Sequence, residues 1–94
     1  MAKFIKKPVI IEAEQLNIEH FKLEKGVLHK VEIFGKSFNV WFMDADSPYI
    51  LIPTLEGNMM AKHSDWIIKG IKGELYPCRE DIFFLTYDKV NENE

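Results

Sequence analysis

The chain has 94 residues, of which 47% are hydrophobic and 29% charged, and its formal net charge is −3 at pH 7. This length suits one folding unit and excludes two separate cores, and the apolar content excludes a disordered chain. Basic residues are scattered apart from Lys3, Lys6 and Lys7, so the sequence disfavours nucleic-acid binding.

Cysteine content and apolar runs set the expected compartment. Cys78 is the single cysteine, which excludes an intrachain disulfide and a cysteine-rich zinc cluster. Lysines interrupt the first residues, where a signal peptide needs an apolar run, and no run reaches membrane-spanning length. We therefore expect a cytoplasmic protein without membrane association, metal or cofactor.

The first elements predicted are a strand and a short helix. The β-branched run at residues 9–11 follows a proline, as strand starts often do, and predicts a strand over residues 4–13. Asn17 is a good helix N-cap and Gly26 a good stop, so the spacing predicts a helix over residues 17–25.

The middle of the chain has the alternation of a β-hairpin. Strands are predicted over residues 27–34 and 37–43 around a turn at Gly35. Within the second strand Phe38, Val40 and Phe42 alternate with Ser37, Asn39 and Trp41. After a cluster of turn formers, the apolar run at residues 49–52 predicts a buried strand.

The last third predicts a meander of short antiparallel strands. These strands cover residues 58–61, 65–69 and 74–76, and a helical turn or two follows within residues 79–87. The predicted fold class is α+β, with a mainly antiparallel, strongly curled or barrel-like sheet, one short packed helix and a short C-terminal helical piece. The predicted domain is residues 1–89, with a frayed tail at residues 90–94.

Groups that could carry chemistry are few. The histidines lie on three different predicted elements, and none has metal-ligand spacing. Cys78 has no histidine nearby in sequence, and no serine lies in a nucleophile elbow. Asp65 and Glu74 could meet across a hairpin as an acid/base pair, or could simply be solvated carboxylates at strand ends.

Two blocks of the sequence carry a resemblance to a known family. The first is KKPVIIEA at residues 6–13, and the second runs from TLEGNMMA at 54–61 through SDWIIKG at 64–70 and GELYPC at 73–78 to DIF at 81–83 and TY at 86–87. Together they resemble a family of short phage and prophage proteins that has no established activity, cofactor or catalytic residue. The resemblance implies a phage or prophage origin and a bacterial cytoplasm.

The chain departs from the pattern of this family at two positions. Ser64 stands where the family usually has a glycine, which argues against a left-handed turn residue there. Glu80 stands where a proline is common, which loosens the expected helix start.

Three functions remain open from the sequence. The first is an accessory binding module for a protein or a small ligand, and the second is a homo-oligomer that associates through strand edges or apolar patches. The third, least supported, is an enzyme with a site at Asp65, Glu74 and Tyr76. The candidate ligand or partner surface comprises Asp65, Trp66, Glu74 and Tyr76.

The same residues also suit a purely structural role, which the pattern favours. Alternation places Trp66 and Ile68 on one face of a strand and Ile67 on the other, so at least one face belongs to the core.

Overall fold

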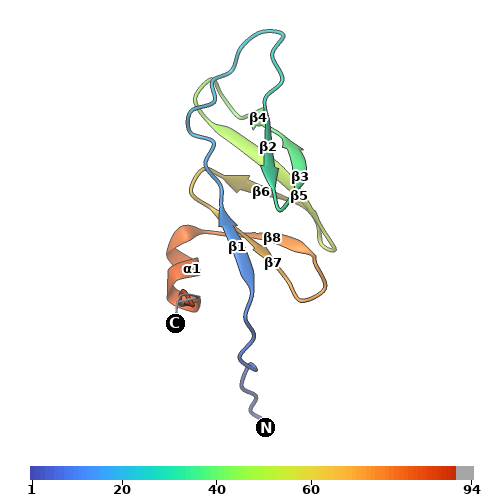
Figure 1. Ribbon diagram of the computed structural model, residues 1–94, viewed down its shortest axis with the longest axis vertical. Helices are drawn as coiled ribbons and strands as arrows, with labels where there is room; N and C mark the ends of the chain where they lie inside the picture. The colour runs from blue at the N-terminus through green and yellow to red at the C-terminus, as the bar shows by residue number, and fades with distance from the viewer. Residues whose placement is uncertain (91–94) are drawn as a thin grey trace.

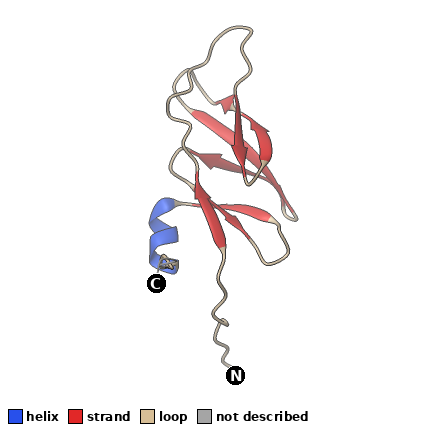
Figure 2. Ribbon diagram, viewed as in Figure 1, coloured by secondary structure: helices blue, strands red, loops and turns tan. Residues whose placement is uncertain are grey.

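Eight short strands and one helix make up the part of the chain, residues 1–90, that this computed structural model describes (Figures 1 and 2). The strands are β1 (Glu12–Gln15), β2 (Lys30–Ile33), β3 (Lys36–Asn39), β4 (Trp41–Phe42), β5 (Pro48–Thr54), β6 (Gly57–Lys62), β7 (Trp66–Lys69) and β8 (Leu75–Cys78). The helix, α1, covers Glu80–Thr86. Every strand pair in this part of the chain is antiparallel.

The strands form three small sheets, with the orders β1-β7-β8, β2-β3 and β4-β5-β6. In Figure 1 the first sheet and α1 occupy one half of the molecule, and the other two sheets occupy the other half. The chain therefore starts in one half, builds the second half from β2 to β6, and returns. The molecule is elongated, with principal extents of 54 × 38 × 23 Å.

The hydrophobic core lies where the two halves meet. It consists of Leu16, Ile18, Ile33, Val40, Ile50, Ile52, Ala61, Ile67 and Leu75. Strand alternation selects these positions: Ile50 and Ile52 on β5 are fully buried, whereas Leu51 between them is partly exposed. The register sets Ile50 opposite Ala61, whose small side chain leaves room for the isoleucine.

The sheet β1-β7-β8 is covered on both faces. Ile67 faces the core, and Trp66 on the other face stacks on Phe83 of α1. A strand buried on both sides explains why β7 is apolar at three successive positions.

Several sequence expectations are confirmed. Phe38, Val40 and Phe42 are more buried than the residues that alternate with them. The hairpin of β2 and β3 turns at Phe34 and Gly35, both with positive φ. The strands of the last third are present as β6, β7 and β8, and the C-terminal helical piece is α1.

The predicted curled or barrel-like sheet is wrong. The strands form three separate small sheets, and none closes on itself. The strands are short, two residues in β4 and four in most others. The central strand β5 has Pro48 and Pro53 near its ends, and a proline has no N–H with which to extend a ladder.

The predicted helix over residues 17–25 is also wrong, because this segment is a loop. Its backbone makes two short-range turn bonds, from Phe21 N–H to Ile18 C=O and from Val27 N–H to Glu24 C=O, and the Leu23 N–H donates to the distant Ala45 C=O. Ile18 is fully buried and Phe21 packs on the core. Contacts with the rest of the molecule have replaced a helix that would be marginal at this length.

The predicted strand over residues 4–13 has the wrong bounds. β1 starts at Glu12, which pairs with Lys69, and after Lys69 the β7 strand ends in the turn that begins at Gly70. Residues 1–11 therefore have no neighbouring strand. We call them the N-terminal arm, which runs away from the body in Figure 1. Of the predicted tail, Val90 is exposed and residues 91–94 lie outside the described residues.

Candidate binding surface

The two carboxylates predicted as an acid/base pair lie at opposite ends of the β7–β8 hairpin. Asp65 precedes the pair Trp66–Cys78, and Glu74 precedes the pair formed by Leu75 with Lys69. Five residues of extended chain separate the two ends, a distance on the order of 16 Å. The structure does not bring these carboxylates together.

Each of these carboxylates accepts a hydrogen bond from a backbone N–H group in a turn. Asp65 Oδ2 accepts a hydrogen bond from Lys62 N–H at 2.9 Å, and Glu74 Oε2 accepts one from Lys72 N–H at 3.0 Å. The Glu74 side chain also lies against Gly70, where an added Cβ would meet Glu74 Oε1 at 1.9 Å. A larger residue at position 70 would displace the Glu74 side chain, and both acids contribute to the turns of the hairpin.

Trp66 belongs to an aromatic cluster under α1. Its ring stacks on Phe83 with centroids 4.5 Å apart and planes 6° apart, and Phe83 in turn contacts Tyr87 at 5.1 Å. The Trp66 indole Nε1 is buried and has no acceptor among the described residues. The side chain is therefore packed within the protein, which supports its structural interpretation.

Tyr76 and Cys78 lie on the same side of β8 as this cluster. Burial, followed by a hydrogen bond with Tyr87, raises the pKa of Tyr76 to about 12. Burial and the nearby Asp65 and Asp81 carboxylates raise the pKa of the Cys78 thiol. Both groups are held in their neutral forms at neutral pH, which does not suit a nucleophile.

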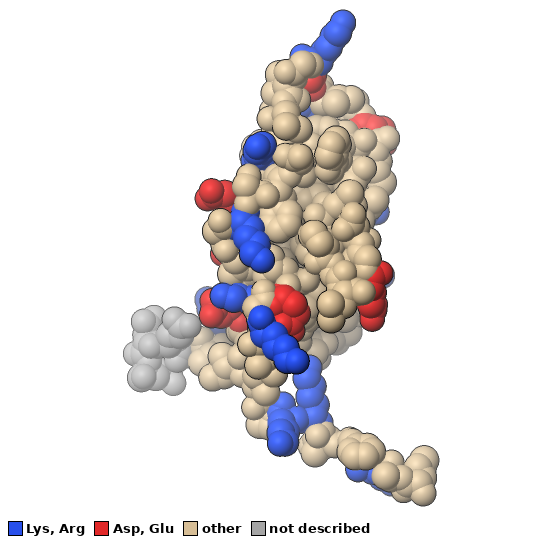
Figure 3. Space-filling view, turned by 90° about the vertical axis from the view of Figure 1, so that its right-hand side faces the viewer, with Lys and Arg blue, Asp and Glu red and all other residues tan. Residues whose placement is uncertain are grey.

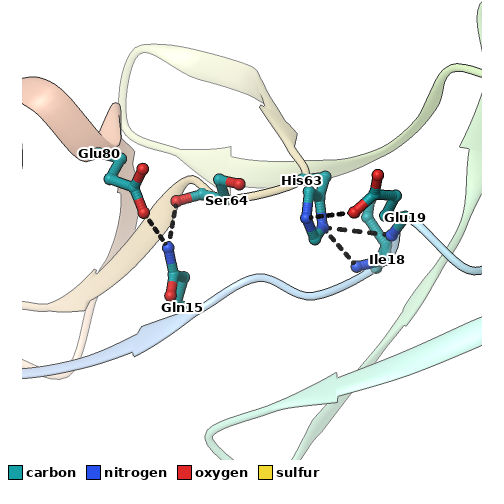
Figure 4. Close-up of polar contacts among 6 residues, drawn as sticks. All are labelled: Gln15, Ile18, Glu19, His63, Ser64 and Glu80. Carbon is teal, nitrogen blue, oxygen red and sulfur yellow. Dashed lines mark hydrogen bonds and ion pairs between the residues drawn. The ribbon is translucent and has the colours of Figure 1, made fainter.

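His63 joins two segments that are far apart in sequence, a role that sequence reasoning missed (Figure 4). Its Nδ1 accepts hydrogen bonds from the backbone N–H groups of Ile18 and Glu19, both at 3.2 Å. Its Nε2 lies 3.1 Å from Glu19 Oε2. Since Nδ1 accepts, the neutral ring carries its proton on Nε2 and donates it to Glu19.

Gln15 makes a second junction beside His63. Gln15 Nε2 donates to Ser64 C=O and to a carboxylate oxygen of Glu80 (Figure 4). The end of β1 is thereby tied to the β6–β7 turn and to the start of α1. No local sequence signal could reveal either junction, because the partners are 44 to 65 residues apart.

A shallow groove opens where β3, the β5–β6 turn and the β7–β8 turn converge. It has a volume of about 380 Å³ and a largely apolar lining of Phe38, Ile52, Pro53, Leu55 and Leu75. Lys36 and Glu74 also line it. These elements lie on the right in Figure 1, and Figure 3 shows a mostly uncharged surface on that side.

A second recess lies at the base of the arm. Residues 9–11 line it together with Lys69 and Ile71. The groove and this recess share the β7–β8 connection, since Gly73 lines the recess and Glu74 lines the groove. The arm thus leaves the body next to the groove.

The arm itself exposes large apolar side chains. Phe4 is 94% exposed, Ile5 92% and Ile10 80%. Lysines lie between these residues, and Figure 3 shows the arm extending from the body with basic side chains along it. Lys6 Nζ lies 5.8 Å from the centroid of the Tyr87 ring.

Comparisons with known proteins found no matching family, no matching curated protein and no matching solved structure. Within residues 1–90, no three potential metal-ligating side chains come together. The helix of this same part of the chain is too short and too polar to cross a membrane.

Proposed function

We propose that this chain is a small accessory binding module that engages a protein partner through its N-terminal arm. The observation that carries the proposal is the exposure of Phe4, Ile5 and Ile10 on a segment that makes no strand pairing. Contiguous exposed apolar residues next to charged ones are typical of surfaces that a partner covers.

A protein partner fits the arm better than a small ligand does. Small-ligand sites are concave and bury most of the ligand, whereas the groove is shallow and the arm projects from the body. An extended segment with apolar and basic side chains is instead suited to lie in a groove or along a strand edge of another protein. The resemblance to phage and prophage proteins favours a bacterial cytoplasm as the setting.

The packed hairpin supports a binding module over an enzyme. Asp65 and Glu74 bond turn amides at its two ends, Trp66 is stacked on Phe83, and Tyr76 is held neutral. The four residues of the candidate surface therefore support the fold, and the partner surface is assigned to the arm.

The test compares the native chain with a double variant, Phe4→Asp and Ile5→Asp, as bait for proteins of a bacterial host. We expect the native chain to bind a protein that the double variant does not bind, and the binding to recur when both proteins are purified and mixed. Leu23→Asp is the matched control, because Leu23 is also exposed but lies outside the arm. Binding that is indifferent to the arm variant would contradict the proposal.

A further inference from the structure

The chain exposes more surface than a monomer of its size should. Its accessible surface is 7683 Å², whereas a folded monomer of 11.0 kDa exposes about 5,600 Å². Its radius of gyration is 15.6 Å, against about 12.4 Å for a compact domain of this length. The excess of roughly 2,000 Å² on each copy is larger than the roughly 800 Å² that each partner of a standard protein interface buries, so one interface can cover part of it.

Charge argues against pairing one arm with another arm. Lys3, Lys6 and Lys7 are its only charged side chains, so the rest of the chain carries −6 against a whole-chain charge of −3. Two arms side by side would place six lysines together. The arm of one copy and the body of another have opposite charge and attract each other.

The groove offers the arm a complementary seat. Its apolar lining suits Phe4 and Ile5, and its open shape admits a segment of extended chain. Glu74 and Lys36 line the groove, and Glu56 follows Leu55 in the chain, so two carboxylates against one lysine are available to Lys6 and Lys7. Leu55 is fully exposed in the single chain and would be covered by the seated arm.

The positions of the arm and the groove allow a reciprocal arrangement. Residues 4–7 lie five to eight residues before Glu12, a reach of about 15–25 Å beyond β1. The base of the arm and the groove lie on either side of the β7–β8 connection. A two-fold axis near that connection would bring each arm to the groove of the other copy and close the assembly.

We infer that the partner of the arm is a second copy of this chain, and that residues 4–7 of each copy occupy the groove of the other. This inference rests on the proposed binding function and names its partner.

Mass in solution tests the inference first, by light scattering across a concentration series. We expect twice the monomer mass for the native chain. Phe4→Asp with Ile5→Asp in the arm, or Leu55→Asp in the groove, should each weaken the dimer at least tenfold, and Leu23→Asp should leave it unchanged. All these side chains are exposed, so circular dichroism should show the same fold in every variant.

Disulfide trapping tests the seat itself, in a Cys78→Ala background. One protein carries Phe4→Cys, another carries Leu55→Cys, and the two are mixed and mildly oxidised. We expect a mixed disulfide between the two proteins, and none when Leu23→Cys replaces Leu55→Cys.

Two outcomes would overturn the inference. A monomeric mass at every concentration is one. A dimer that survives both the arm and the groove variants is the other. A monomer whose arm still captures a host protein would overturn only the second-copy inference and leave the proposed function standing.

Discussion

Two apolar runs in this chain have similar composition, but one is buried in a sheet and the other is exposed. Residues 9–11 and residues 66–68 are both rich in β-branched side chains, and both predict a strand. The second run lies at the centre of a sheet, with Ile67 and Ile68 buried. The first lies in the arm, where Ile10 is 80% exposed.

The difference lies in the partners that each run finds. Residues 66–68 have β1 on one side, β8 on the other, the core on one face and α1 on the opposite face. Residues 9–11 have none of these, because β7 turns away after Lys69. Hydrophobic patterning shows that a segment needs to be covered, but it does not show whether the same chain covers it.

The largest expected effect compares one aromatic residue from each region. Trp66→Ala removes the stack on Phe83 and should lower the free energy of unfolding by about 3 kcal/mol or more. Phe4→Ala removes a side chain that contacts little, and should change it by less than about 0.5 kcal/mol in dilute solution. Urea melts of both variants measure the contrast.

The control for this pair is Glu74→Gln, which keeps the size of a side chain at the end of the same hairpin. It should leave the fold intact. A Trp66→Ala protein as stable as the native chain would show that the aromatic cluster does not hold α1 against the sheet.

The next effect concerns the junction that ties down the far end of β1. His63→Ala leaves the N–H groups of Ile18 and Glu19 without their acceptor and should cost about 1–2 kcal/mol of unfolding free energy. Hydrogen exchange at these two amides should accelerate with it. Glu19→Gln leaves His63 Nδ1 in place as the acceptor and weakens only the exposed hydrogen bond between His63 Nε2 and the Glu19 side chain, so it should cost less than about 0.5 kcal/mol.

A smaller gain in stability is expected at the neighbouring Ser64. Its φ of 77° lies in the left-handed region, which is unfavourable for a residue with a Cβ. Ser64→Gly should therefore raise the free energy of unfolding by about 0.5–1 kcal/mol, since the relief of strain exceeds the entropy that glycine loses. Ser64→Ala keeps the Cβ and should give no gain, and equal gains from the two variants would contradict this account.

Ser64 also shows how far the sequence predicts this molecule. Patterning located β6, β7, β8 and α1, because the turn glycines and the alternation are local signals. The turn at residue 64 keeps its left-handed residue although serine replaces the expected glycine, because Ser64 N–H is bonded to Leu16 C=O far away in sequence. The same kind of distant contact replaced the predicted helix at residues 17–25.

The candidate site was less predictable than the fold. The sequence drew attention to Asp65, Trp66, Glu74 and Tyr76, and these residues proved to be occupied by contacts within the chain. The exposed arm was predicted as a strand instead. An apolar segment stays exposed when the strand that could pair with it ends too early. Here the register of β1 on β7 decides this, because the pairing stops at Glu12 and Lys69.

The last expected effect is a loss of stability that occurs only in alkaline solution and comes from the ionisation of Tyr76. Burial beside Tyr87 raises the pKa of Tyr76 to about 12 in the folded state, above its ordinary value of 10.0. The folded protein therefore holds the phenolic proton more tightly than the unfolded chain does. The stability contributed by neutral Tyr76 should be constant below pH 10 and should fall as the pH rises from 10 to 12. Urea melts across this range should show the fall in the native chain and a weaker one in Tyr76→Phe, which cannot ionise at that position. Identical pH profiles for the two proteins would mean that Tyr76 ionises as easily in the aromatic cluster as in water, and that the space between β8 and α1 is open to solvent.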